Sequence, residues 1–125
     1  MPEPGNPLDI EENRIRAVFG LPAHAPLPSV SKETLAQYHE YLFGKLSFPF
    51  QALYAETAPP VKQVVRYVTV IGLSDNAKRR QYGLFCKVDF GDRMVELPIA
   101  EMGMQEDDPN RQLIDDYLFW LWSGR

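Results

Sequence analysis

The feature that most constrains the fold is a change of hydrophobic period near residue 50. From residue 50 to residue 100 the apolar side chains recur at every second position, as in a β-strand, whereas the segments on either side repeat every three or four residues. In YGLFCKVDF (residues 82–90), Lys87 and Asp89 point away from an apolar face made by Tyr82, Leu84, Cys86, Val88 and Phe90. Gly91-Asp92 then predicts a hairpin into a return strand, RMVELPIA (residues 93–100).

Two further strands are predicted before this hairpin. FPFQALYAE (48–56) is the first, and Pro59-Pro60 ends it. VKQVVRYVTVIGL (61–73) is partly apolar on both faces, which is typical of a central strand or of one wrapped around a barrel. SDNAKRRQ (74–81) is a polar loop. In the return strand, Pro98 favours an edge position because it cannot donate a hydrogen bond to a neighbour.

Helical patterns flank the strands. Ser31 is placed to cap a helix over residues 31–46, whose apolar stripe is Leu35, Tyr38, Leu42 and Leu46. A terminal helix follows Pro109, with Asp108 or Asn110 as its cap. Its stripe of Leu113, Ile114, Tyr117, Leu118 and Leu121 predicts packing on the sheet, with Asp115, Asp116 and Phe119 facing outward.

The order of elements predicts an α+β domain. We expect a small curved antiparallel sheet, or a partly open SH3-like barrel, of four or five strands flanked by helices. Six of the eleven prolines lie in the first 28 residues. Residues 1–30 are therefore predicted to form a Pro-rich arm with one short helix, capped by Asp9 and ended by Gly20, and residues 31–125 a single domain.

Composition excludes several functional classes. The single cysteine, Cys86, allows no internal disulfide and fits a cytoplasmic protein, and the Pro-rich acidic start does not resemble a secretory signal. No apolar run approaches the roughly 20 residues that span a bilayer. Nucleic acid is disfavoured because the one basic run, residues 78–80, is short. Nucleophile, phosphate-loop and zinc patterns are absent, so we expect no enzyme activity.

The negative charge is concentrated in one stretch, residues 101–116. It holds one base, Arg111, and six acids: Glu101, Glu106, Asp107, Asp108, Asp115 and Asp116. The stretch therefore carries −5, whereas the whole chain carries −4, which leaves the remainder at +1. Such a concentration favours a cation or a basic partner at this place.

The six carboxylates of this stretch suit a hard cation such as Ca²⁺, which takes about 6–8 oxygen ligands at about 2.3–2.6 Å. Residues seven apart on a helix, such as Asp108 and Asp115, are about 10 Å apart along its axis, which is too far for them to share one ion within the helix. The acids before the helix and the acids on it therefore form two possible half-sites. The Asp115-Asp116 half then needs oxygens from outside the helix. The same acids are also explained without a metal, by helix capping at Asp107-Asp108 and by an Arg111–Asp115 pair.

Several segments together resemble the small calcium-binding protein family of cyanobacteria and other bacteria (CcbP-like). They are YHEYLFGKLSFPFQALY (38–54), VTVIGL (68–73), YGLFCKV (82–88), ELPIAEM (96–102) and NRQLIDDYLFWLW (110–122). The resemblance implies a monomeric α+β domain that binds calcium with modest affinity, as a buffer, through surface carboxylates. At the matching positions it selects Glu101, Asp115 and Asp116, to which the charge argument adds Glu106, Asp107 and Asp108.

The leading hypothesis is thus a cytoplasmic, non-enzymatic calcium-binding protein with neither a nucleic-acid nor a membrane partner. The alternative is a protein–protein interaction module without a metal. It would bind a basic partner through the acidic face together with Phe119 or Trp122.

Overall fold

The computed structural model describes residues 7–58, 61–75 and 83–123, and side chains within residues 10–55, 64–75 and 83–123. Three α-helices and five β-strands make up this part of the chain. The helices are α1 (Pro7–Val18), α2 (Lys32–Lys45) and α3 (Arg111–Ser123). The strands are β1 (Phe50–Ala58), β2 (Val61–Leu73), β3 (Phe85–Asp89), β4 (Met94–Pro98) and β5 (Met102–Met104), with the 3₁₀ turn η2 (Ile99–Glu101) between the last two.

The five strands form one antiparallel sheet in the order β4-β3-β2-β1-β5. The sheet is open, which confirms the α+β class and the small antiparallel sheet of four or five strands. The sequence did not identify β5, because its three residues are too few to show a period. Through η2 the chain crosses from β4, at one edge of the sheet, to β5 beside β1 at the other.

The alternating pattern of the predicted hairpin is confirmed. Leu84, Cys86, Val88 and Phe90 are all buried, whereas Lys87 between them is exposed. Phe90 N–H donates to the carbonyl of Arg93 at 2.9 Å across the turn. Pro98 ends the edge strand β4, as predicted. Tyr82, the Pro59-Pro60 break and residues 76–81 of the polar loop lie outside the described residues.

Two helix ends follow from capping chemistry, but the predicted cap of the first helix is wrong, because α1 begins at Pro7 and Asp9 lies inside it. The Ser31 hydroxyl accepts from Thr34 N–H, and the Thr34 hydroxyl accepts from Ser31 N–H, so the predicted cap of α2 is a reciprocal one. At the end of α1, Gly20 has a φ of +68°, and the next amide, Leu21 N–H, donates to the Arg16 carbonyl at 2.9 Å. This is a Schellman ending, which requires a left-handed residue and therefore favours glycine.

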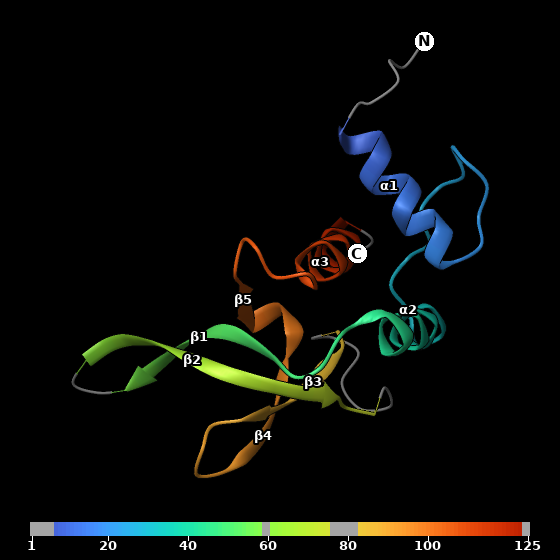
Figure 1. Cartoon of the computed structure of the whole chain (residues 1–125). Coiled ribbons are helices and arrows are strands. Elements are labelled where there is room, and N and C mark those ends of the chain that lie inside the picture. The colour runs from blue at the N-terminus through green and yellow to red at the C-terminus, as the bar shows by residue number, and fades with distance from the viewer. Residues whose placement is uncertain (1–6, 59–60, 76–82, 124–125) are drawn as a thin grey trace.

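The helices lie above one face of the sheet (Figure 1). In this view α2 and α3 are both seen end-on, α1 crosses above them, and the β1–β2 hairpin extends past the helices. The core fills the space between sheet and helices, and the predicted stripe of α2 faces it: Leu35, Tyr38, Leu42 and Leu46 are buried. None of the helices in the described part of the chain is long and apolar enough to cross a membrane.

The predicted orientation of α3 is wrong on one flank. Its buried residues are Ile114, Asp116, Tyr117, Trp120 and Leu121, so Asp116 faces inward, and Phe119 packs against the core instead of facing out. The reason is that α3 does not pack on the sheet alone. The helices α1 and α2 also contact it, and they cover the flank that carries Asp116 and Trp120. Asp115 remains exposed, as predicted.

Candidate functional site

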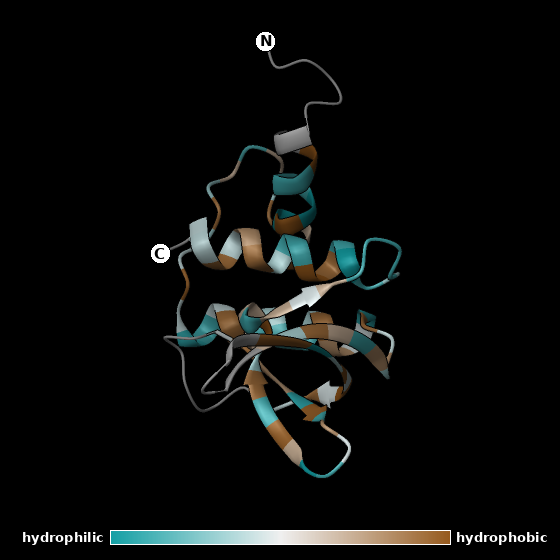
Figure 2. Cartoon of the chain, turned by 90° about the vertical axis from the view of Figure 1, so that its left-hand side faces the viewer, coloured by the Kyte–Doolittle hydropathy of each residue, from teal (hydrophilic) through white to brown (hydrophobic). Residues whose placement is uncertain are grey.

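An open cleft of about 330 Å³ lies beside the start of α3. It is bounded by α1, by the loop that precedes α3, and by the first turns of α3 itself. Figure 2 shows this loop and several turns of α1 in teal, the colour of hydrophilic residues. The lining residues are Glu11, Arg14, Glu106, Asp108, Pro109, Arg111, Gln112, Asp115 and Asp116. Five carboxylates and two guanidinium groups thus line one cleft.

Asp116 is the buried carboxylate of the cleft, with only 5% of its surface exposed. Its two oxygens accept hydrogen bonds from Arg14 of α1: Nε donates to Oδ2 at 2.7 Å and Nη2 donates to Oδ1 at 2.9 Å. This two-point geometry is the strong form of an arginine–carboxylate pair. It explains how an aspartate is tolerated on the inward flank of a helix.

Asp115 has a weaker partner. Arg111, one turn earlier, donates from Nε to Oδ2 at 3.2 Å, and both side chains are substantially exposed. This confirms the pair expected from the i,i+4 spacing. Exposed pairs of this kind contribute only about 0.3–0.5 kcal/mol, so Asp115 can exchange its partner at little cost.

The loop before α3 is held by its own polar groups. Asp108 Oδ1 accepts from Asn110 N–H at 2.8 Å, a local turn. Asn110 is the residue before the first helical one, but its side chain does not cap the helix. Instead Oδ1 accepts from Ser47 N–H at 2.8 Å and Nδ2 donates to the Ser47 carbonyl at 3.0 Å. These two bonds fix the start of α3, and hence the cleft, to the end of α2.

Glu11 is the carboxylate of the cleft that the sequence did not identify as a site residue. Burial raises the pKa of its carboxyl above the usual 4.5, and the neighbouring carboxylates of Asp116 and then Asp115 raise it as well, while Arg14 opposes them. In the sequence Glu11 is one acid in the first turns of a helix, where acids are common for dipole reasons. Only the docking of α1 on α3 brings it near Asp116.

Two predicted site residues do not line the cleft. Glu101 is exposed at the end of η2, and Asp107 is exposed in the loop between β5 and α3. The structure therefore brings together Glu106, Asp108, Asp115 and Asp116, which were expected as two half-sites, and adds Glu11 to them.

The donor chemistry of the cleft fits a hard cation, because carboxylate oxygens are the ligands that Ca²⁺ prefers. The distances among these carboxylates are less favourable. Among the described residues no three His, Cys, Asp or Glu side chains lie close enough to hold one ion together. Arg14 and Arg111 each donate a hydrogen bond to one aspartate of the cleft.

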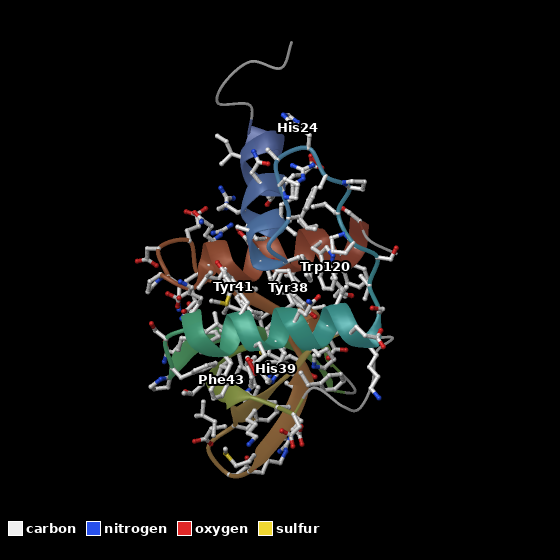
Figure 3. The ribbon with its side chains drawn as sticks, turned by 90° about the vertical axis from the view of Figure 1, so that its right-hand side faces the viewer. His24, Tyr38, His39, Tyr41, Phe43 and Trp120 are labelled. Carbon is white, nitrogen blue, oxygen red and sulfur yellow. The ribbon has the colours of Figure 1, made fainter. Side chains whose placement is uncertain are left out.

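Two further reactive side chains, Cys86 and His39, lie away from the cleft. Cys86 is buried between strands, and burial raises the pKa of its thiol to about 12. His39 lies on the sheet side of α2, where its Nε2 is 2.8 Å from the Ser74 carbonyl (Figure 3). Figure 3 also shows Tyr38 and Trp120 between α2 and α3, and their ring centroids are 5.0 Å apart. Tyr38, Cys86 and Trp120 all belong to the buried core.

Comparisons with known proteins agree with this fold. A sequence model of the CcbP family, described as calcium binding, matches residues 29–121. The crystal structure of Anabaena CcbP is similar with a TM-score of 0.66 at 22% identity, over 97% of this chain and 95% of that one. A calcium-binding protein in its calcium-binding form is similar with a TM-score of 0.65 at 21% identity, over 93% and 92% of the two chains. No curated protein sequence matches significantly.

Proposed function

Because this chain belongs to the CcbP family of calcium-binding proteins, we propose that it binds Ca²⁺ in the cleft between α1 and the start of α3. The ligands would come from three separate segments. They are Glu11 on α1, Glu106 and Asp108 in the loop before α3, and Asp115 and Asp116 on α3. The chain's own function in this proposal is to supply oxygens, with no catalytic step.

The observation that carries the proposal is the convergence of five carboxylates on one open cleft that holds only two arginines. Like charges gathered in this way repel one another, and a divalent cation relieves the repulsion more effectively than water does. Burial raises the pKa of Glu11, and the neighbouring carboxylates of Asp116 and Asp115 raise it further, in keeping with that repulsion.

We propose a buffering role, since an open cleft with spread ligands favours modest affinity and fast release. The other parts of the proposal follow from the sequence: a cytoplasmic monomer that binds a divalent cation, has neither a nucleic-acid nor a membrane partner, and consists of an arm, residues 1–30, on a domain, residues 31–125. Neither Cys86 nor His39 lines the cleft, so the proposal assigns no role to a thiol or an imidazole.

Titration calorimetry with CaCl₂ on chelator-treated protein tests the site. We expect wild-type protein to bind calcium and the double variant D108N/D115N to bind it at least about tenfold more weakly, since each loses a charged ligand. The double variant E101Q/D107N is the matched control, because it removes the same charge from two acids outside the cleft. Loss of binding in the control alone would place the site elsewhere.

The alternative, a metal-free interaction module, is favoured by one observation. Trp122 is 60% exposed and lies two turns after Asp115 on α3. Phe119 is less suited to this role than expected, because it packs against the core. A basic peptide that bound the protein with equal affinity in calcium and in chelator, and lost affinity on W122A, would favour this function over calcium binding.

A further inference from the structure

Arg14 blocks the most buried ligand of the proposed calcium site. Both oxygens of Asp116 are engaged by the Arg14 guanidinium, at 2.7 and 2.9 Å. A calcium ion needs at least one of these oxygens at about 2.3–2.6 Å. The guanidinium covers the side of the carboxylate on which an ion would bind both oxygens. Binding of Asp116 through both oxygens therefore requires Arg14 to move away.

The two arginines of the cleft differ in how firmly they hold their partners. Arg111 makes one contact, at 3.2 Å, with an exposed aspartate on its own helix. Arg14 makes two shorter contacts with a buried aspartate on another helix, although its own side chain is 37% exposed. Buried charged groups depend strongly on their partners, because water compensates them poorly. Arg14 is therefore the cation that a calcium ion would have to replace.

Arg14 also has room to leave. Its exposed side chain lines an open cleft, so the guanidinium can turn toward solvent without disrupting the core. The neighbouring Ile15, by contrast, is fully buried and keeps α1 docked by apolar contact. Displacement of Arg14 therefore requires a side-chain movement and does not require α1 to unfold.

We propose that Arg14 is an internal counter-ion that competes with calcium for Asp116. This inference rests on the proposed function and adds a regulatory element to it. Without calcium, Arg14 neutralises Asp116 and ties α1 to α3; with calcium, the ion takes over the carboxylate and the guanidinium is released. The competition lowers the affinity of the site, since part of the binding free energy replaces an existing ion pair.

Replacing Arg14 with glutamine tests the competition. R14Q is expected to bind calcium about tenfold more tightly than wild type, a change of about 1.4 kcal/mol. In chelator the same variant should melt at a lower temperature than wild type, and calcium should raise its melting temperature by more. R16Q is the matched control: it removes the same charge from the same helix, where Arg16 bonds the Ala25 carbonyl and Asn13 away from the cleft.

The outcomes separate the two proposals. If wild type binds no calcium, the proposed function itself fails. If wild type binds calcium but R14Q and R16Q have the same affinity as each other, the competition is wrong and Arg14 is only structural. If R14Q is unfolded in chelator, an NMR measurement on the wild-type protein decides between competition and a purely structural role of Arg14.

A measurement on the wild-type protein checks the same point without any substitution. The Nε–H group of Arg14 donates to Asp116, so its NMR signal should be protected from exchange with water in chelator. Saturation with calcium should remove that protection while the amide signals of α1 persist. A protected Nε–H signal at saturating calcium would contradict the proposal.

Discussion

At the level of single residues, the carboxylates of the cleft differ in how their charge is compensated. Asp116 has a two-point partner in Arg14, and Asp115 has a weak one in Arg111. Burial raises the pKa of the Glu11 carboxyl, and the charges of Asp116 and Asp115 raise it further, while Arg14 opposes them. Glu11 is therefore the residue at which the cost of assembling the cleft should be measurable.

We predict that E11Q is more stable than wild type at pH 7 in chelator. The pKa of Glu11 is raised in the folded protein, so the folded state holds this proton more tightly than the unfolded state does. The contribution of the Glu11 carboxyl to folding stability therefore falls as the pH rises from 4.5, the usual pKa of this group, through its raised pKa in the folded state. At higher pH the contribution stays low. Melting temperatures of E11Q and wild type should diverge with rising pH over this window.

Calcium should reverse the sign of this effect, because Glu11 then supplies a ligand. Saturating calcium should therefore raise the melting temperature of E11Q by less than it raises that of wild type. E40Q is the control, since Glu40 is an exposed acid on α2 away from the cleft. Equal pH profiles for E11Q and wild type would show that the pKa of Glu11 is not raised in the folded protein.

At the level of elements, α3 is the helix that positions the cleft, and hydrogen bonds fix it at both ends and in the middle. Asn110 bonds the Ser47 backbone at its start, and Trp120 Nε1 donates to the Pro28 carbonyl at 2.8 Å near its end. In between, the Tyr117 hydroxyl accepts from Leu84 N–H at 2.6 Å. The helix is thus tied to α2, to the arm and to the sheet.

The contact between Tyr117 and the chain before β3 predicts a strong effect of G83A. Gly83 has a φ of +78°, and a Cβ there would collide with the Tyr117 hydroxyl and approach Leu121 to 3.0 Å. We expect a loss of about 2–4 kcal/mol, the sum of backbone strain and overpacking.

G91A is the matched control, because Gly91 has a φ of +100° but nothing within 4 Å of its Cβ position. It should lose only about 1–2 kcal/mol from backbone strain. Urea denaturation of both variants measures the difference. Equal losses would mean that α3 can move away from Gly83 without penalty.

At the level of the whole molecule, the described part of the arm contributes side chains to the hydrophobic core. Ile15 of α1 is fully buried, and the ring of Phe19 contacts Tyr38 and Trp120 at centroid distances of 5.6 and 5.4 Å. The division into an arm, residues 1–30, and a domain, residues 31–125, stays a proposal about organisation. The packing indicates that both parts unfold together.

We predict that I15A destabilises the whole protein by about 3 kcal/mol, the usual cost of truncating a buried isoleucine. I10A, the same change on the same helix at a residue that is 45% exposed, should cost much less. Unfolding of each variant should be followed by tryptophan fluorescence and by far-UV circular dichroism. If I15A melts only α1 and leaves the main transition unchanged, the arm is a separate unit.

The sequence by itself determined all the helices and four of the five strands of the described part of the chain, because these depend on local chemistry. The two-residue period of residues 82–90 predicted the buried face of β3, Ser31 predicted the start of α2, and Pro98 predicted an edge strand. The acidic stretch also identified four of the five carboxylates that line the cleft. The short β5 was missed, since three residues carry no readable period.

Only the tertiary structure decided which acids meet. Periodicity assigns one apolar stripe to a helix, but α3 is contacted by both α1 and α2, so Asp116 is buried although its sequence neighbours suggested an outward face. Its partner Arg14 lies 102 residues away in the chain, and Glu11 is brought to the same place by the docking of α1. Charge pairing between distant segments leaves no local signature, so only the folded chain reveals it.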